Sequence, residues 1–134
     1  QKMKKISILL LLCGAIFFVA CKEKTIAQEV RVLTPQEFKD SIENHPEIQL
    51  LDVRTPEEFA EGHLVDAENI NVMESEFLTK VEKLDPEKPV YLYCRSGRRS
   101  AKASALLKEA GFKEIYDLQG GFLEWESNGY KAEN

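Results

Sequence analysis

Apolar residues follow two different periods along this chain. Short continuous runs rich in branched and aromatic side chains predict buried strands, and they occupy residues 48–53, 67–72, 89–93 and 115–118. Segments with apolar residues every three or four positions predict helices, and they occupy residues 34–44, 55–61, 75–84 and 100–110, with a last one after Gly121. Because helices alternate with strands, the pattern favours an α/β domain with a mainly parallel sheet.

Two of the predicted helices carry the same start signal. In each, a threonine is followed by proline and, three positions after the threonine, by glutamate, at Thr34–Glu37 and at Thr55–Glu58. This is the pattern of a capping box with proline at the first helical position. Gly62 is placed to end the second of these helices.

The start of the chain has the layout of an export signal. Lys2, Lys4 and Lys5 precede an apolar run over residues 6–20, which is too short to read comfortably as a membrane-spanning helix. We therefore expect residues 1–20 to be a signal peptide and the protein to be exported. An uncleaved anchor is one alternative, and an ordinary signal peptide cut elsewhere is another.

The end of that run resembles a bacterial lipobox. Val19 and Ala20 precede Cys21, although Phe18 stands where leucine is usual. We expect Cys21 to carry lipid, residues 21–29 to form a polar tether, and residues 30–134 to form one domain at the cell envelope. The membrane is then met only through the lipid anchor.

The predicted mature domain is acidic. The whole chain has a formal net charge of −5, and loss of residues 1–20 removes three lysines and no acid, which leaves −8. An acidic surface argues against a nucleic-acid partner. The length suits one domain, which we expect to be monomeric.

Cys94 is the one cysteine left to the predicted domain, since Cys13 leaves with the signal peptide and Cys21 carries the lipid. A single thiol cannot form an internal disulfide. Cys94 follows the buried run 89–93 and opens a loop with Gly97 that leads into a helix. Such a junction aims backbone N–H groups and the positive end of the helix dipole at the centre of the loop. A sulfur atom placed there would be held as a thiolate nucleophile.

Three arginines follow within five residues of Cys94, at positions 95, 98 and 99, inside an otherwise acidic chain. A local charge cluster of the opposite sign to the whole chain indicates an anion site. A salt-bridged helix start is the alternative.

Three motifs in order resemble those of rhodanese-like sulfurtransferase domains. They are Leu51–Phe59 with Gly62–Leu64 and Ala67–Ile70, the loop Tyr93–Ala101, and Asp117–Phe122 with Trp125. The resemblance covers about residues 30 to 131, which is nearly the whole predicted mature chain.

The resemblance implies a three-layer α/β/α fold around a five-stranded, mainly parallel sheet. It also implies transfer of sulfane sulfur through a persulfide on Cys94, from a small anionic donor such as thiosulfate to a thiol or cyanide acceptor. Two half-reactions with a covalent intermediate are nucleophilic catalysis of the ping-pong type. We expect no cofactor, and no His, Cys or Asp spacing suggests a metal site.

Beyond the catalytic Cys94, the predicted substrate-binding residues are the rest of the loop: Arg95, Ser96, Gly97, Arg98, Arg99 and Ser100. Their backbone N–H groups would stabilise both the thiolate and the persulfide. The guanidinium groups of Arg95 and Arg99 are candidates to dock the oxyanion end of the donor, whereas Arg98 faces solvent or an acidic neighbour. Ser100 is expected to cap the helix rather than to donate to sulfur.

Other polar residues of the motifs are predicted to be structural. Asp52, Arg54 and Glu58 would form an ion-pair and hydrogen-bond set beneath the loop, as in the family. His63 is expected to be a structural histidine, because a persulfide mechanism needs no general base.

Two other functions fit parts of the pattern. A cysteine phosphatase needs five residues between its cysteine and its arginine, but the sixth residue after Cys94 is Ser100, so the loop is one residue too short. A non-enzymatic sulfur carrier or interaction module stays open, since Cys94 could receive sulfur from a protein partner.

Overall fold

A computed structural model of the chain describes residues 29–134. The strands of this part are β1 (Glu29–Leu33), β2 (Gln49–Asp52), β3 (His63–Leu64), β4 (Glu68–Asn69), β5 (Val90–Tyr93), β6 (Glu114–Leu118) and β7 (Ala132–Glu133). Its helices are α1 (Pro35–Asn44), α2 (Pro56–Glu61), α3 (Phe77–Val81), α4 (Arg98–Glu109) and α5 (Gly121–Ser127). Within these residues no helix is long and apolar enough to cross a membrane.

The predicted signal peptide, the lipidation site at Cys21 and the tether up to Gln28 lie outside the described residues. The structure therefore bears only on the predicted domain. Glu29, which the sequence placed at the end of the tether, is already the first residue of β1.

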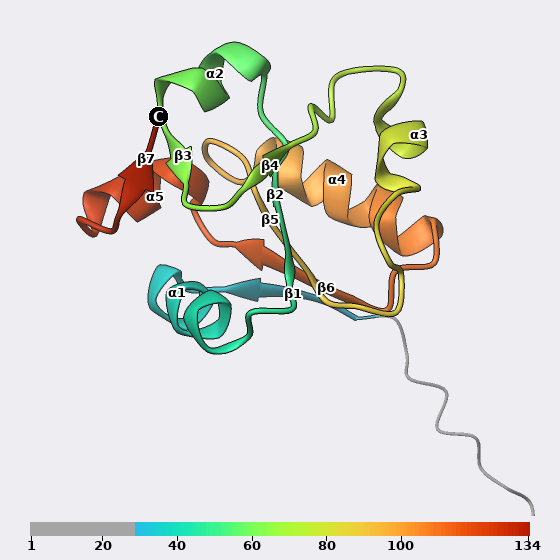
Figure 1. Cartoon of the computed structure of the whole chain (residues 1–134), viewed down its shortest axis with the longest axis horizontal. Helices are drawn as coiled ribbons and strands as arrows, with labels where there is room; N and C mark the ends of the chain where they lie inside the picture. Colours follow the sequence, from blue (N-terminus) through green and yellow to red (C-terminus); the bar gives the residue numbers. More distant parts are fainter. Residues whose placement is uncertain (1–28) are drawn as a thin grey trace, which may run out of the picture.

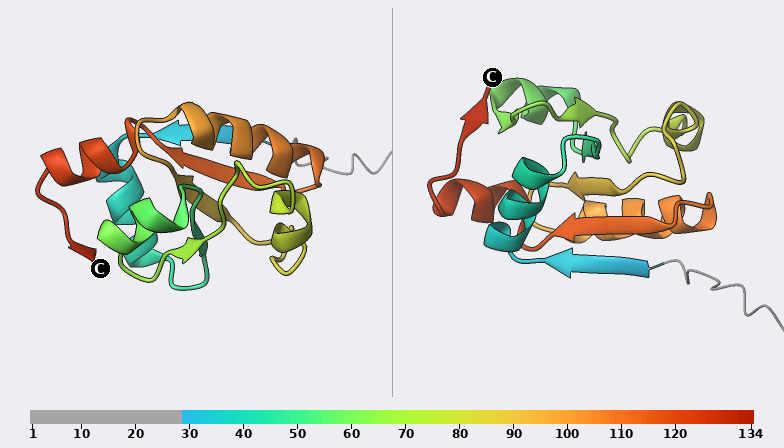
Figure 2. Two further views of the ribbon diagram at one scale, coloured as in Figure 1. Left: turned by 90° about the horizontal axis from the view of Figure 1, so that it is seen from above. Right: turned by 60° about the horizontal axis from the view of Figure 1, so that its bottom comes forward.

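Five strands form one sheet in the order β1-β6-β5-β2-β4, and every pairing in it is parallel. Helices α1 and α5 pack on one face of the sheet, and α4 packs on the other (Figure 1). Figure 2 shows α4 and α1 on opposite sides of the strands when the molecule is seen from above. The predicted three-layer α/β/α fold with a five-stranded sheet is confirmed.

The face toward α4 carries the larger of the two apolar cores. Leu92 and Ile115 of the sheet, Leu107 of α4 and Phe77 of α3 are almost completely buried in it. Cys94 belongs to the same cluster, at the end of β5. The sulfur therefore lies at the edge of a well-packed core, where water has little access.

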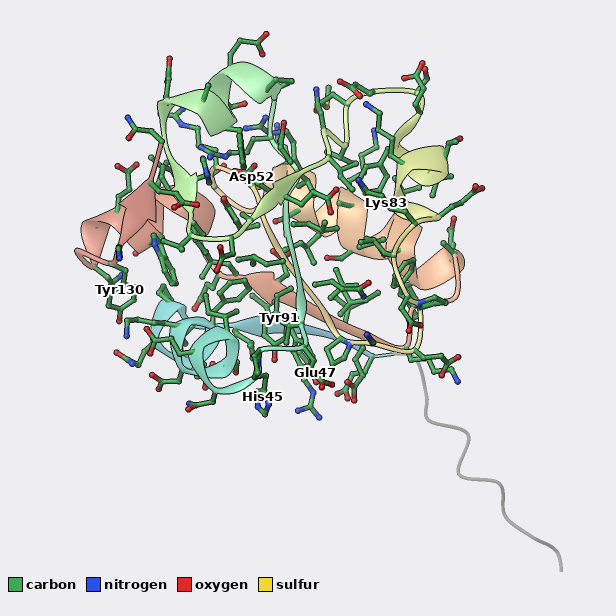
Figure 3. The ribbon with its side chains drawn as sticks, in the orientation of Figure 1. His45, Glu47, Asp52, Lys83, Tyr91 and Tyr130 are labelled. Carbon is green, nitrogen blue, oxygen red and sulfur yellow. The ribbon has the colours of Figure 1, made fainter. Side chains whose placement is uncertain are left out.

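The face toward α1 and α5 is built on aromatic rings. The ring of Phe38 meets those of Tyr91 and Trp125 edge to face, with centroids 5.4 and 6.3 Å apart. Figure 3 shows Tyr91 where the sheet meets α1. These contacts hold α5 close to the carboxyl ends of the strands, where the loop after β5 lies.

Both predicted capping boxes are present. In α1 and in α2 the threonine hydroxyl accepts from the backbone N–H of the glutamate, and the glutamate carboxylate accepts from the backbone N–H of the threonine. Gly62 ends α2 as predicted, with φ of 155°. The path of the chain around α2 is thus set by short-range hydrogen bonds.

Three strands were not predicted. β1 lies at the edge of the sheet and is mostly exposed, so it lacks the continuous apolar run of a buried strand. β3 and β7 are each two residues long and pair antiparallel with each other, although the whole second half of the chain separates them in the sequence. A pair this short and this distant in sequence leaves no periodicity to detect.

The start of α5 is hydrogen-bonded to the loop that follows β5. The backbone N–H groups of Phe122 and Leu123 donate to the carbonyl oxygens of Cys94 and Arg95, at 2.8 and 3.1 Å. Gly121 permits this approach, because a Cβ atom there would lie 2.6 Å from the Arg95 carbonyl group. Its φ of +60° also belongs to the left-handed region that favours glycine.

We expect Gly121→Ala to destabilise the domain strongly, because the methyl group meets backbone that cannot move aside. The free energy of unfolding should fall by about 3 kcal/mol, from overpacking together with left-handed strain. Gly129→Ala is the matched control, because its φ is +71° and no atom lies within 4 Å of the added Cβ. It should cost about 1 kcal/mol, from backbone strain alone. Urea denaturation of the three proteins measures the difference, and equal losses would contradict the steric argument.

Candidate active site

Cys94 is the first residue after β5 and is 1% exposed. The next residues curl into a loop that ends at Gly97, and α4 begins at Arg98. Gly97 has a φ of +112°, so the curl depends on the conformational freedom of glycine. The thiol is free, with no disulfide partner in the part of the chain described.

Within residues 29–134, two groups form hydrogen bonds with the sulfur. The backbone N–H of Gly97 donates to Cys94 Sγ at 3.0 Å, and the Sγ lies 3.4 Å from Ser100 Oγ, with the thiol as donor. Ser100 in turn donates to the carbonyl oxygen of Gly97 at 3.2 Å. If the thiol loses its proton, the Ser100 hydroxyl can reverse its role and donate to sulfur.

Other donors of the loop are unoccupied. Among residues 29–134 no hydrogen-bond acceptor is recorded for the backbone N–H groups of Arg95, Ser96, Arg98, Arg99 and Ser100. Since the first N–H groups of a helix have no partner within it, the start of α4 adds the positive end of a 12-residue helix to the loop. The loop is thus built to receive an anion.

Ser100 does not cap α4, so that prediction is wrong. The helix begins at Arg98, with Gly97 as its N-cap and no capping hydrogen bond from a side chain. Ser100 lies in the first turn with its side chain completely buried against Cys94. The expected start of the helix was two residues late, which made Ser100 look like a cap.

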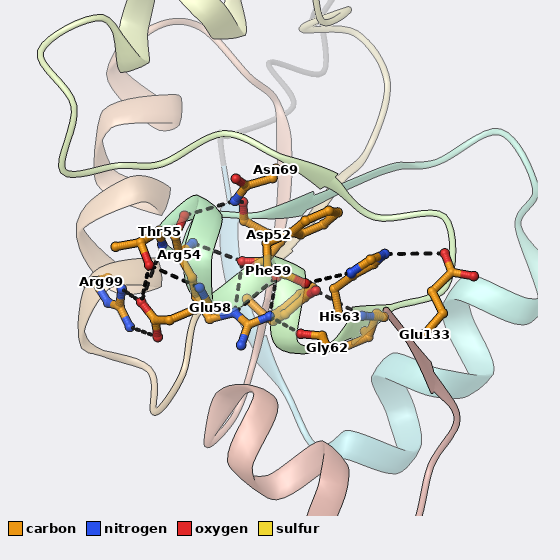
Figure 4. A network of polar contacts seen from close by, with 12 residues as sticks. Asp52, Arg54, Thr55, Glu58, Phe59, Gly62, His63, Asn69, Arg99 and Glu133 are labelled. Atoms are coloured by element: carbon orange, nitrogen blue, oxygen red, sulfur yellow. Dashed lines mark hydrogen bonds and ion pairs between the residues drawn. The ribbon is translucent and has the colours of Figure 1, made fainter.

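The loop arginines separate into two kinds. Arg99 forms a two-pronged ion pair with Glu58 of α2, at 2.6 and 2.8 Å (Figure 4). These hydrogen bonds hold the pKa of Glu58 at about 2, well below its ordinary 4.5, although burial acts in the opposite direction. Arg95 and Arg98 are exposed, and no ion pair is recorded for either within residues 29–134. The charge free of ion pairs therefore belongs to Arg95 and Arg98, whereas Arg99, which was predicted with Arg95 to dock the donor, is held by Glu58.

A buried ion pair supports the chain from β2 to α2. The Arg54 guanidinium donates to both carboxylate oxygens of Asp52, the shorter contact being 2.6 Å, and to the carbonyl oxygen of Gly62. Its guanidinium also lies 4.4 Å from the centre of the Phe122 ring. The expected structural set is therefore present but divided, with Asp52 on Arg54 and Glu58 on Arg99 (Figure 4).

His63 is structural, as predicted. Its ring stacks on Phe59 with centroids 3.7 Å apart, and Nδ1 lies 2.9 Å from the Phe59 carbonyl oxygen. Nε2 lies 3.4 Å from a carboxylate oxygen of Glu133 in β7, which Figure 4 also shows. The side chain fixes α2 to the end of the chain and makes no contact with Cys94.

Asp117 is a polar residue of this region that the sequence analysis did not single out as a site. It lies at the end of β6, is 5% exposed, and burial raises its pKa from 3.8 to about 6, partly offset by Ser100. The available signal was an acid within the apolar run 115–118, next to a loop predicted to bind anions.

Other parts of the described surface offer little chemistry. No group of three or more His, Cys, Asp or Glu side chains within residues 29–134 could hold a metal ion. A pocket of about 450 Å³ lies beside α1 and α5, with Ile42, Val65 and Trp125 among its lining residues. None of its lining residues belongs to the loop 94–100, so the pocket is separate from the sulfur.

Comparison with known proteins agrees with this geometry. The sequence model of the rhodanese-like domain matches residues 34–128. The chain belongs to the rhodanese-like family. Its fold resembles that of a rhodanese-related protein from Thermoplasma volcanium, with a TM-score of 0.68 and 30% identity over 77% of this chain and 97% of the other.

The relatives of this rhodanese-like chain include two bacterial proteins. It is 33% identical to the protein YqhL of Bacillus subtilis, over 92% of this chain and 94% of YqhL. It is 37% identical to the thiosulfate sulfurtransferase GlpE of Coxiella burnetii, over 61% of this chain and 75% of GlpE.

Proposed function

We propose that this rhodanese-like domain is a sulfurtransferase that carries sulfane sulfur as a persulfide on Cys94. The observation that carries the proposal is the 3.0 Å hydrogen bond from the Gly97 N–H to Cys94 Sγ, inside a loop of free N–H donors. A site of this kind lowers the energy of an anion on sulfur both before and after transfer. The similarity to a relative named as a thiosulfate sulfurtransferase supports the same reaction class.

The reaction needs Cys94 as its one nucleophile. It needs no oxidant or reductant besides the sulfur donor and acceptor. The Cys94 thiolate attacks the outer sulfur of thiosulfate, the sulfur–sulfur bond of the donor breaks, and sulfite leaves with the electron pair. The product is an anionic persulfide on Cys94. A thiolate or cyanide acceptor then attacks the outer sulfur, which restores the Cys94 thiolate.

The charges around the loop favour an anionic donor. Arg95 and Arg98 are exposed beside the loop, whereas Arg99 is held by Glu58. A guanidinium group is well suited to bind the oxygens of a sulfonate-like donor. We infer that Arg95 and Arg98 dock the donor, and that Arg99 positions α4 through Glu58.

The first prediction concerns the covalent intermediate. Incubation of the purified full chain with thiosulfate should add one sulfur atom to the peptide that contains Cys94, measured by mass spectrometry after digestion. Cyanide should remove it. Cys94→Ser, which leaves Cys13 and Cys21 in place, should gain no sulfur at position 94. A wild-type protein that accepts sulfur only from a protein partner, and none from thiosulfate, would favour the sulfur carrier instead.

The second prediction separates docking from structure. Arg95→Gln should lower kcat/KM for thiosulfate about tenfold, but lower it only about threefold for methanethiosulfonate, which carries one negative charge less. Arg98→Gln should act in the same direction. Lys88→Gln removes an exposed charge ahead of β5, at the opposite end of that strand from the loop, and should change neither value. Equal losses with both donors would assign Arg95 to loop structure.

We also propose that the protein is an exported lipoprotein anchored through Cys21, with residues 22–28 as its tether. Lys4, Lys5 and the apolar run 6–20 support export, and the Val-Ala-Cys sequence supports lipidation. An anchor of two or more acyl chains gives stable attachment to a membrane.

The third prediction tests that anchor in cells that express the full chain. Cys21→Ala should abolish membrane association of the processed protein or cause the precursor to accumulate, as seen by fractionation and immunoblotting. Cys13→Ala is the matched control and should behave like the wild type. Normal processing and attachment of Cys21→Ala would leave only a general export signal.

A further inference from the structure

A buried polar cluster lies behind Cys94, and the proposed reaction does not use it. Asp117 shares its face of β6 with Ile115, which packs toward α4, and it is 5% exposed. From α4, Ser100 and Ser104 are also buried, with exposed fractions of 0% and 2%. One face of the first two turns of α4 is thus polar where the rest of the core is apolar.

The hydrogen bonds of this cluster are incomplete. Neither Asp117 Oδ1 nor Ser104 Oγ has a hydrogen-bond partner within residues 29–134. Ser100 Oγ already accepts from the Cys94 thiol and donates to the Gly97 carbonyl oxygen. A buried carboxylate without a donor is costly, whereas a protonated carboxyl group becomes a donor itself. Ser100 lies close enough to Asp117 to lower the pKa of its carboxyl group, so Ser100 Oγ is available as the acceptor.

No charged side chain of the described part of the chain compensates a charge on Asp117. Its neighbours in the sheet are Val32 of β1 and Leu92 of β5, and α4 presents Ser100 and Ser104. Burial raises its pKa to about 6, Ser100 acts in the opposite direction, and none of the charged side chains within residues 29–134 contributes to the shift. The titratable group within reach is Cys94, on the other side of Ser100.

The start of α4 favours one negative charge near it. Cys94 and Asp117 are both acids close to that helix start, joined through Ser100. Two anions so close in a water-poor core repel each other, so the charge on one favours a proton on the other. The Gly97 N–H donates to the sulfur and further N–H groups of the loop are free, so the donors of the site favour an anion at Cys94 rather than at Asp117.

We propose that Asp117 is a positioning residue for Cys94, whose protonated carboxyl group donates to Ser100 Oγ and so directs the Ser100 hydroxyl proton onto the sulfur anion. No proton leaves the cluster in this arrangement. The Asp117 proton stays on its carboxyl group, and the Ser100 hydrogen bond moves from the Gly97 carbonyl oxygen to Cys94 Sγ. This role of Asp117 concerns the Cys94 thiolate itself. It rests on the proposed function only where the same role is extended to the Cys94 persulfide.

The dependence on pH has a definite sign. Below about pH 6 Asp117 holds its proton, and Ser100 is free to donate to sulfur. As the pH rises through 6, the carboxylate forms, attracts the Ser100 proton and withdraws that donor from Cys94. Asp117→Asn keeps a donor at all pH values and carries no charge, so it imitates the protonated state.

The test is the rate of Cys94 alkylation by iodoacetamide between pH 5 and 8, measured on the full chain by mass spectrometry of the Cys94 peptide. Asp117→Asn should match the wild type at pH 5 and react about fivefold faster at pH 8, the effect of one hydrogen bond. Ser104→Ala removes a buried hydroxyl one turn away and should leave the wild-type profile unchanged. In a Ser100→Ala background, the ratio between asparagine and aspartate at position 117 should fall to about twofold, because the connecting hydroxyl is absent and only the repulsion between the two charges remains.

A ratio that does not change with pH, or one that stays about fivefold in Ser100→Ala, would overturn the proposal. Alkylation needs no sulfur donor, so this outcome is independent of whether thiosulfate forms a persulfide. A measurement on the wild-type protein tests the proposal even if one of the variants fails to fold. The carbon-13 signal of the Asp117 carboxyl group should titrate near pH 6, and titration near the ordinary 3.8 would equally exclude the proposal.

Discussion

The structure of the site depends on one backbone contact between the start of α5 and the loop after β5. The N–H groups of Phe122 and Leu123 bind the carbonyl oxygens of Cys94 and Arg95. Because the C=O and N–H of a trans peptide point in opposite directions, fixing these carbonyls turns the following N–H groups away from α5. Gly121 allows the two backbones to come this close. Aromatic packing of Phe38 on Trp125 holds α5 in place. The core between the sheet and α1 therefore helps to shape the loop at the carboxyl end of β5.

The charged residues of the motifs divide the work of support and recognition. Arg54 is enclosed by the Asp52 carboxylate, the Gly62 carbonyl and the Phe122 ring. Its positive charge is therefore paired within the fold. The Arg99–Glu58 pair joins the start of α4 to α2 at the surface. The positive charge available at the site is therefore smaller than the three loop arginines of the sequence suggest. Arg99, one of the three, is neutralised by Glu58, which lies 41 residues away in the sequence.

Much of the fold followed from short-range patterns. The buried strands β2, β5 and β6 are apolar runs, and the starts of α1 and α2 are encoded by capping boxes, so both were predictable. The exposed edge strand β1 and the β3–β7 pair were not, because they are specified by distant partners. Ser100 was misassigned for the same reason: its role comes from where α4 meets Cys94 in space. The family resemblance identified the loop, but the separation of Arg99 from Arg95 and Arg98 required the three-dimensional position of Glu58.

The polar face at the start of α4 shows what this anion site demands of the core behind it. An apolar face would pack against β6 without unsatisfied atoms, yet Ser100, Ser104 and Asp117 are placed there, and two of their oxygens have no partner within residues 29–134. Such atoms cost free energy in a region of low dielectric. The backbone N–H groups reach the sulfur only from the loop side, so the core side needs a side-chain donor. A serine serves that purpose when its proton is directed to sulfur. In our proposal Asp117 supplies that direction in its protonated form, below about pH 6, without adding a second charge.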